Sequence, residues 1–288
     1  SYAKDFHVKA TYLDLREMLA KEELDIVSVC SWDPQHAEMT VAAAAYKPKA
    51  VLSEKPMACS LAEADAMLIA CKRNDVKLAI GHQRRFYSCW TEARRLIADG
   101  AIGRLRQVQG AFSYFNTDPS NMRNIPELGG GALPDIGVYP TVTTRFATGK
   151  EPLSVSATVE RDPKFGTDIY ADIRAKFDGF ELAFYCSTQM ALRQEMTFHG
   201  EKGFITVHGP FNAGSYDHAR ISLHNAGHDE AQIFRFPGVD QYRLEVEAFA
   251  RKVGGEDVPV FTLAQSILNQ KFIDAVFRAG ESGGWETV

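Results

Sequence analysis

The first third of the chain alternates short apolar segments with longer helix-like segments, and this alternation constrains the fold more than any other feature. Apolar runs at residues 25–30, 50–52 and 77–81 have the length and composition of buried strands. Residues 36–46 and 60–73 lie between these runs and have the length of helices. Strands that alternate with helices are joined by right-handed crossovers, so the pattern predicts an α/β domain with a parallel sheet.

The pattern changes near Arg84, where we place the boundary between a first domain, residues 1–84, and a second domain, residues 85–288. Strand-like runs then follow one another from residue 105 to residue 236 with a single long helix among them, which predicts a mostly antiparallel α+β domain. The last helix has the length to pack back on the first domain. The helices expected in this part are residues 90–99, 135–147, 241–253 and 263–279.

Charge, hydropathy and cysteine spacing exclude several classes of function. The net charge is −5 and the basic residues do not cluster, which argues against a nucleic-acid partner. Apolar runs are too short to span a membrane. The five cysteines lack zinc or redox spacing, which predicts free thiols and a cytoplasmic protein. His224 and His228 flank a turn-like segment, so no metal site is expected.

Lys55 follows the apolar run 50–52 directly, within the segment Ser53-Glu54-Lys55-Pro56. Open α/β sheets bind ligands at the carboxyl ends of their strands, which is where this lysine lies. One hypothesis makes Lys55 a cation that contacts a bound cofactor or a substrate oxygen and favours ionisation of a nearby phenol. The alternative is a surface lysine in a strand-to-helix turn. We also predict a cis Lys55–Pro56 peptide bond in this tight turn.

Asp135 and Tyr139 lie four residues apart at the start of a predicted helix, so they share one helix face. As a functional pair, Tyr139 is a general acid/base on a carbinol or carbonyl oxygen, and Asp135 orients the substrate or Lys55. The alternative makes Asp135 a helix N-cap and Tyr139 a core residue. The preceding glycines, residues 129–131, favour function because glycine lets the backbone approach a ligand closely.

Two further loops follow strands of the predicted parallel sheet. Ser31 and Asp33 come after the first apolar run and can touch a nucleotide. The segment also fits a capped helix start, with Asp33 as N-cap and Pro34 as the first helical residue. Arg84 and Arg85 come after the third run and can face a substrate cleft. The alternative for the two arginines is a solvated pair at the domain junction.

The Glu54-Lys55-Pro56 motif, the string from Gly129 to Tyr139 and the two-part organisation together resemble the Gfo/Idh/MocA oxidoreductases. The tyrosine at position 139 is similar to the branch with glucose-fructose oxidoreductase, dimeric dihydrodiol dehydrogenase and xylose dehydrogenase. The resemblance implies an incomplete Rossmann-type parallel-sheet domain followed by a mostly antiparallel open-sheet α+β domain. It also implies NAD(P)-dependent transfer of a hydride between nicotinamide and a carbinol or carbonyl carbon of a sugar, polyol or cyclic diol.

The same resemblance assigns roles to individual residues. It slightly favours NADP over NAD, and it implies a small carbohydrate-like substrate and a homodimer or homotetramer formed through the second sheet. The catalytic residues would be Lys55, Asp135 and Tyr139; the cofactor-binding residues Ser31, Asp33, His36, Glu54, Lys55 and Gln83; and the substrate-binding residues Arg84, Arg85 and Tyr139.

One departure from the family pattern concerns the start of the chain. The family begins with a strand and a Gly-x-Gly-x-x-Gly turn that binds the pyrophosphate, whereas the first glycine here is Gly81. We therefore expect an N-terminally truncated first domain, a short strand at residues 7–11 without a sheet partner, and weak NAD(P) binding. Two alternatives stay open: an NAD-dependent glycoside hydrolase of the same fold, and a non-catalytic binding or regulatory protein.

Overall fold

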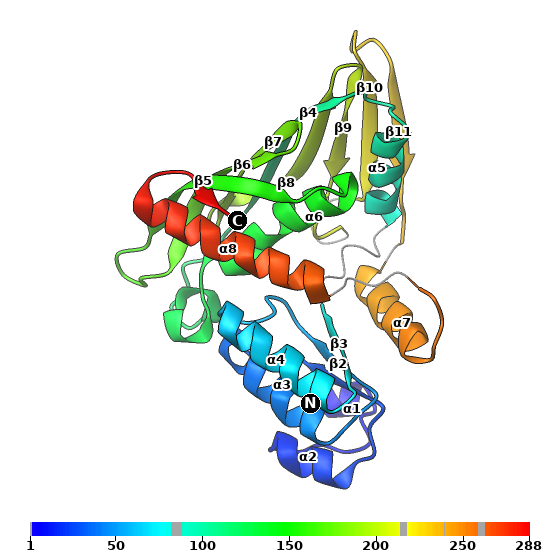
Figure 1. Cartoon of the computed structure of the whole chain (residues 1–288), viewed down its shortest axis with the longest axis vertical. Helices are drawn as coiled ribbons and strands as arrows, with labels where there is room; N and C mark the ends of the chain where they lie inside the picture. Colours follow the sequence, from blue (N-terminus) through cyan, green and yellow to red (C-terminus); the bar gives the residue numbers. More distant parts are fainter. Residues whose placement is uncertain (1, 82–87, 214–217, 239, 259–262) are drawn as a thin grey trace.

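The computed structural model describes residues 2–81, 88–213, 218–238, 240–258 and 263–288. Within these ranges the chain forms two sheets, a small parallel one and a large mixed one, each with its own hydrophobic core (Figure 1). The α/β organisation followed by a mostly antiparallel α+β organisation is therefore confirmed. The predicted boundary near Arg84 lies outside the described residues and stays a prediction.

The small sheet is parallel and has the order β1-β2-β3, with β1 at Ile26–Val29, β2 at Ala50–Ser53 and β3 at Lys77–Ile80. All four residues of β2 are buried, as expected for the central strand. The carboxyl ends of the three strands meet at one edge, and Glu54 and Lys55 follow β2 there. The helices of this part are α1 (Tyr2–Asp5), α2 (Leu15–Lys21), α3 (His36–Ala45) and α4 (Leu61–Arg73).

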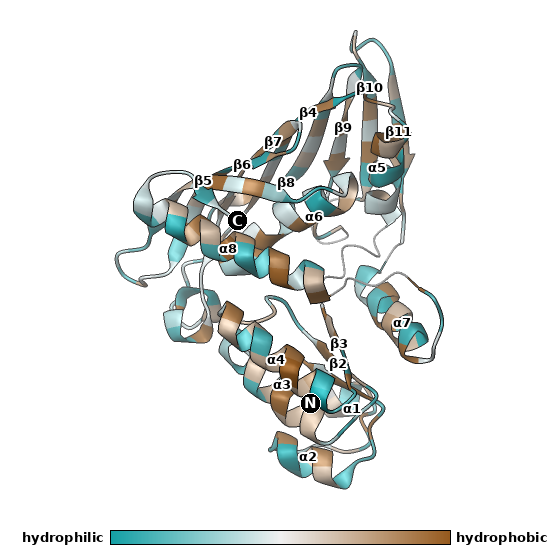
Figure 2. Ribbon diagram, in the orientation of Figure 1, coloured by the Kyte–Doolittle hydropathy of each residue, from teal (hydrophilic) through white to brown (hydrophobic). Residues whose placement is uncertain are grey.

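The helix α4 shows how the sequence specifies these elements. Ser60 is its N-cap and accepts a hydrogen bond from the Glu63 backbone at 3.3 Å, while the Glu63 carboxylate accepts one from the Cys59 backbone. Ala64, Met67 and Cys71 follow at helical spacing and are buried. Figure 2 shows hydrophobic turns on α3 and α4, which pack against each other over the sheet.

The expected strand at residues 7–11 is wrong, because this segment forms a turn and irregular structure. A segment needs a neighbouring strand to satisfy its backbone groups as a strand, and none is adjacent in the described chain. Among the described residues, β1 pairs with β2 and with no second strand.

The large sheet contains nine strands among the described residues, in the order β11-β10-β9-β8-β4-β7-β6-β5-β12. Its neighbouring strands are antiparallel except for β4 and β7, which are parallel. The bounds are β4 (Leu105–Phe115), β5 (Pro152–Arg161), β6 (Asp168–Phe177), β7 (Phe180–Ser187), β8 (Gln189–Gly200), β9 (Gly203–His208), β10 (Arg220–Asn225), β11 (Ala231–Arg235) and β12 (Glu286–Thr287).

Helices α5 (Ser88–Ala98), α6 (Val138–Thr148) and α8 (Leu263–Ser282) share one core with the large sheet. Trp90 of α5 is fully buried in that core, donates to the Pro210 carbonyl at 3.0 Å and meets Phe198 edge-on. Between β4 and α6 the chain forms three short turns of helix, η3 (Met122–Asn124), η4 (Pro126–Leu128) and η5 (Leu133–Gly137).

Two helices from the end of the chain contact the first domain. Leu263 and Ile267 of α8 pack against the core of the small-sheet domain, and α8 lies between the two parts in Figure 1. Phe249 of α7 (Gln241–Val253) is buried against Ala50 and Leu52 of β2. These contacts hold the carboxyl edge of the small sheet opposite the large sheet.

Candidate active site

Two cavities meet at the end of β2, between the small sheet and the large one. The larger has a volume of about 530 Å³ and opens toward the large sheet, and the smaller, of about 160 Å³, lies on the side of the β1–α3 turn. Four residues line both cavities: Glu54, Lys55, Arg123 and Asp135. The predicted residues Lys55, Asp135 and Tyr139 all line the larger cavity.

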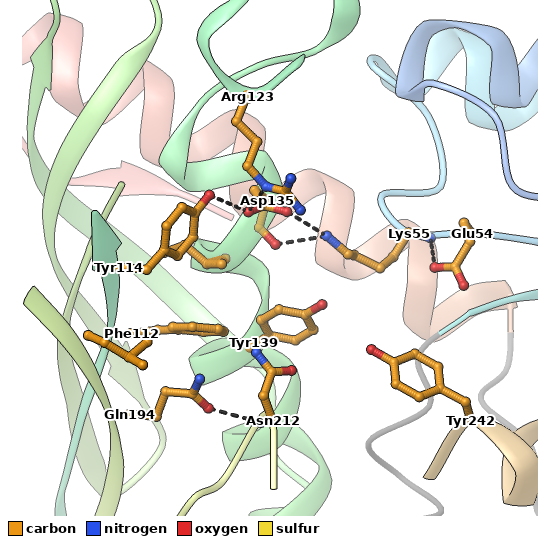
Figure 3. A pocket seen from close by; sticks show the side chains of 12 residues that line it. Glu54, Lys55, Phe112, Tyr114, Arg123, Asp135, Tyr139, Gln194, Asn212 and Tyr242 are labelled. Atoms are coloured by element: carbon orange, nitrogen blue, oxygen red, sulfur yellow. Dashed lines mark hydrogen bonds and ion pairs between the residues drawn. The ribbon is translucent and has the colours of Figure 1, made fainter. Parts of the chain in front are cut away.

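Lys55 points away from its own loop toward the second domain, as Figure 3 shows. Its Nζ donates to the Asp135 carbonyl oxygen at 2.9 Å and to Asp135 Oδ1 at 3.2 Å. The lysine side chain is 14% exposed, so it is not the surface lysine of the alternative interpretation. Burial lowers the pKa of Lys55, but Coulombic interactions with Tyr139 and Asp135 and the hydrogen bond to Asp135 raise that pKa more, so the ammonium form is favoured.

Asp135 is bound on three sides. Besides Lys55, Arg123 Nε donates to Asp135 Oδ2 at 2.7 Å, and the Tyr114 hydroxyl donates to the same oxygen at 2.7 Å. Burial raises the pKa of this carboxyl, but the charges of Lys55 and Arg123 with these hydrogen bonds lower it to about 2. Asp135 is therefore a carboxylate with fixed partners.

Asp135 is not a helix N-cap, because it lies inside η5, a five-residue π-helical turn that leads into α6. Turns of this kind often occur at functional sites. The sequence interpretation of one regular helix from residue 135 was wrong in this detail. The π-helical turn and α6 are continuous, so Asp135 and Tyr139 still line the same cavity.

Tyr139 is held by two aromatic neighbours. Its ring centroid lies 5.6 Å from that of Phe112 and 5.6 Å from that of Phe211, and the residue is 6% exposed. Lys55 Nζ lies 5.4 Å from the centroid of the Tyr139 ring. Figure 3 shows the hydroxyl pointing into the space between Lys55 and Tyr242. The ring of Tyr139 thus packs in the hydrophobic core, while its hydroxyl faces the cavity.

The smaller cavity is lined by every described residue that was predicted to bind the cofactor: Ser31, Asp33, His36, Glu54 and Lys55. The Ser31 hydroxyl is buried and has no hydrogen-bond partner among the described residues. Burial raises the pKa of the Asp33 carboxyl to about 6, although Lys55 and His36 lower it. A buried hydroxyl and a desolvated carboxylate beside an open volume are suited to a hydroxyl-rich ligand such as a nucleotide ribose.

His36 lines the smaller cavity, and both of its ring nitrogens lie within hydrogen-bond distance of backbone carbonyl oxygens. Its Nδ1 is bonded to the Pro56 carbonyl at 2.8 Å and its Nε2 to the Ser31 carbonyl at 3.0 Å, so both ring nitrogens are used by the backbone. It therefore connects the loops after β1 and β2. Asp33 is the first residue of the short helix η1 (Asp33–Gln35) rather than its N-cap, which is Trp32. The Lys55–Pro56 peptide bond is cis, as predicted.

The three glycines before η5 are required by neighbouring protein atoms. A Cβ on Gly129 would lie 2.8 Å from Asp33 Cβ, one on Gly130 would lie 2.6 Å from the Arg123 carbonyl, and one on Gly131 would lie 2.1 Å from Asp168 Oδ1. All three also line the smaller cavity. The run therefore brings three separate segments together at the site.

Gln83, Arg84 and Arg85, which were predicted to contact cofactor or substrate, lie outside the described residues. Several residues that line the larger cavity were not predicted. Except for Ile136, which lies within the Gly129–Tyr139 string, these residues carry no motif signal, and each reaches the site through the fold of the second domain. They are Phe112, Tyr114, Arg123, Ile136, Leu192, Gln194, Asn212 and Tyr242.

Comparison with known proteins gives the class to which this fold and site belong. Residues 1–82 match the family model described as "Oxidoreductase family, NAD-binding Rossmann fold", and residues 90–206 match "GFO/IDH/MocA C-terminal domain". The two-sheet architecture with a lysine, an aspartate and a tyrosine in its cavity is thus that of an NAD(P)-binding oxidoreductase.

Individual relatives give the same result. An uncharacterized oxidoreductase of Rhizobium meliloti is 33% identical over 99% of this chain and 86% of its own length. A D-xylose 1-dehydrogenase [NADP(+)] of Haloarcula marismortui is 27% identical over 94% and 77%. The aldose-aldose oxidoreductase of Caulobacter crescentus, a solved structure, matches with a TM-score of 0.89 and 26% identity over 100% and 87%. The chain belongs to the Gfo/Idh/MocA family of oxidoreductases.

Proposed function

We propose that this protein is an NAD(P)-dependent dehydrogenase or reductase that acts on a carbinol or carbonyl carbon of a sugar, polyol or cyclic diol. The observation that carries the proposal is the convergence of Lys55, Asp135 and Tyr139 on one cavity from segments 80 residues apart. A cation, a fixed carboxylate and a phenol at one cavity are the groups needed to move a proton at a substrate oxygen.

The residues around the smaller cavity are suited to the nicotinamide end of the cofactor. Ser31, Asp33 and Glu54 would hold its ribose hydroxyls, and the backbone of residues 129–131 lines the same cavity. When bound there, the cofactor supplies or accepts the hydride. The NADP(+) in the name of the D-xylose dehydrogenase relative favours NADP over NAD.

Tyr139 is the proposed general acid/base. In the oxidation direction its oxygen accepts the proton of the substrate hydroxyl, and in the reduction direction it returns that proton to the carbonyl oxygen. The Lys55 ammonium near its ring stabilises negative charge that develops on the two oxygens. Asp135 does not transfer the proton, since it is ionised and bound by Lys55, Arg123 and Tyr114. Its role is to orient Lys55.

The lining of the larger cavity favours a neutral hydroxylated substrate. Among the described residues of this lining, the acidic Glu54 and Asp135 balance the basic Lys55 and Arg123. The remaining lining combines aromatic and aliphatic faces with the amides of Gln194 and Asn212 (Figure 3). Apolar faces beside hydrogen-bonding groups are typical of sites for compact polar ligands.

We also propose that two copies pair through the outer face of the large sheet, within the cytoplasm. This face carries acidic and basic side chains close together in sequence, with Asp172 and Arg174 on β6 and Arg193 and Glu195 on β8. Such a face is self-complementary across a two-fold axis. All five cysteines are free thiols, which is typical of a reducing compartment. No helix in the described ranges is long and apolar enough to cross a membrane.

Titration with NADPH and NADH, followed by fluorescence, tests cofactor binding, and reduction of NADP⁺ by a panel of aldoses, polyols and cyclic diols tests the reaction. The proposal expects binding and net cofactor reduction with at least one panel member. Cleavage of a glycoside without net cofactor reduction would instead identify the hydrolase alternative. Cofactor binding without any turnover would favour the non-catalytic alternative.

A further inference from the structure

Asp168, the first residue of β6, carries a buried carboxylate that the proposed mechanism does not use. The residue is 2% exposed, and the described residues give it no ion pair. A carboxylate that loses its hydration without a cation in direct contact is costly, so other groups must also stabilise it.

Those groups belong to the segment that carries the candidate catalytic residues. The Leu133 backbone N–H donates to Asp168 Oδ2 at 2.6 Å, and the neighbouring Ala132 backbone N–H also favours the ionised carboxylate. Leu133 begins η5, and the N-cap residue of η5, Ala132, provides no capping side chain. The Asp168 carboxylate, which belongs to β6, is therefore the hydrogen-bond acceptor for the backbone N–H groups at the start of η5.

Gly131 allows the Asp168 carboxylate to lie this close to the start of η5. Its φ of 143° is unfavourable for other residues, and a Cβ at this position would lie 2.1 Å from Asp168 Oδ1. The absence of a side chain at Gly131 therefore lets the Asp168 carboxylate approach, and the same residue lines the smaller cavity.

We propose that Asp168 is a positioning residue that fixes the π-helical turn η5, and through it the places of Asp135 and Tyr139. This inference rests on the proposed function. Asp135 is two residues beyond Leu133, and Tyr139 follows in the continuous helix α6. A shift of the turn would move the carboxylate away from Lys55 and the phenol away from the substrate oxygen, and displacements of this size are costly for catalysis.

The charge on Asp168 also predicts how the site responds to acid. Burial raises the pKa of Asp168 to about 6, although the Leu133 hydrogen bond and the Arg161 cation of β5 lower it. The Cys186 thiol of β7 is a further titratable group near it. Below this pKa the neutral carboxyl is a weaker acceptor for the two backbone N–H groups. If only the turn shifts and Asp168 stays buried, loss of these hydrogen bonds raises its pKa further, so the turn should loosen as the pH falls through about 6.

The stability effect has the opposite sign to the activity effect. Because the folded-state pKa of Asp168 is above the unfolded value, its contribution to stability is full below about pH 4 and is lost as the pH rises through about 6. A neutral replacement should therefore leave the melting temperature at pH 7.5 unchanged or higher. A residue with only a structural role would lower the melting temperature and the activity together.

The test compares wild type, Asp168→Asn and the control Asp65→Asn, which makes the same substitution at an exposed position of α4. For Asp168→Asn we expect kcat to fall about 10- to 100-fold without a lower melting temperature. Hydrogen exchange of a peptide covering residues 130–139 should become faster. The control should match wild type in all three measurements. A parallel loss of melting temperature and kcat, or unchanged exchange in this peptide, would overturn the proposal.

Wild type alone provides a second test that needs neither a folded variant nor a known substrate. Exchange in residues 130–139, corrected for the intrinsic pH dependence, should lose protection between about pH 7 and pH 5, whereas exchange in α4 should not. Equal protection of residues 130–139 across this range would contradict the role of Asp168. Absence of turnover in wild type would contradict only the proposed function.

Discussion

Lys55 donates two hydrogen bonds to a single residue, Asp135, one to its carboxylate at 3.2 Å and one to its backbone carbonyl at 2.9 Å. The two bonds join the loop after β2 to the turn η5, so one lysine connects the two domains at the candidate site. Both the side chain and the backbone of Asp135 are fixed by this contact, which defines where the proposed proton-transfer groups lie.

Tyr139→Phe should lower kcat by about two to four orders of magnitude, because it removes a positioned acid/base. The Phe ring retains the packing against Phe112 and Phe211, so the fold should be unchanged. Steady-state kinetics measures the effect, and cofactor titration provides the control, which should shift little. A variant that turns over at the wild-type rate would exclude the proposed role.

Asp135→Asn should change the acid limb of the stability curve. The folded-state pKa of Asp135 is lowered to about 2, so its contribution to stability is present above about pH 4 and lost as the pH falls toward 2. The shift corresponds to about 2 kcal/mol of unfolding free energy. Urea unfolding of wild type and variant between these pH values measures the difference in slope. Parallel curves for the two proteins would show that Asp135 does not titrate as described.

Asp33→Asn should raise the stability of the fold and weaken cofactor binding. Burial raises the pKa of Asp33 to about 6, so its ionised form costs stability above that pH. The variant should melt at a higher temperature than wild type at neutral pH, with the difference vanishing near about pH 4. It should also bind NADPH more weakly, because a carboxylate acceptor at the smaller cavity is lost. Unchanged NADPH affinity would remove Asp33 from the cofactor site.

Gly130→Ala should lower activity, because the added methyl group should displace Arg123 from its contact with Asp135. The added Cβ would lie 2.6 Å from the Arg123 carbonyl and 2.7 Å from that of Met122, both backbone atoms that cannot rotate away. We expect a lower melting temperature and a kcat reduced about tenfold or more as Arg123 leaves Asp135. Gly284→Ala is the matched control, since its Cβ would meet only Ser282 Oγ at 3.7 Å. Equal behaviour of the two variants would count against the Arg123 contact.

Much of the fold could be predicted because the signals were local. The apolar runs that became β1, β2 and β3, and the Ser60–Glu63 start of α4, are visible within a few residues of sequence. The segment 7–11 was misjudged because a strand also needs a partner, which short-range patterns do not report.

The candidate site was predictable only in part. Lys55, Asp135 and Tyr139 carry motif signals, and the structure brings them together, although their catalytic roles stay predictions. Arg123, Tyr114 and Asp168 lack such signals, because each meets Asp135 or η5 through contacts between distant segments. The glycine run was expected to admit a ligand, and its closest neighbours are the protein atoms of Asp33, Arg123 and Asp168.

The wall shared by the two cavities links their occupants thermodynamically. Glu54, Lys55, Arg123 and Asp135 face both volumes, so a ligand on one side changes the electrostatic environment of the other. Linkage requires the effect to be reciprocal: the factor by which a cofactor alters substrate affinity equals the factor by which the substrate alters cofactor affinity. We therefore expect the binding of one ligand to change the affinity for the other. The charge of Lys55, which lines both cavities, should contribute to this coupling.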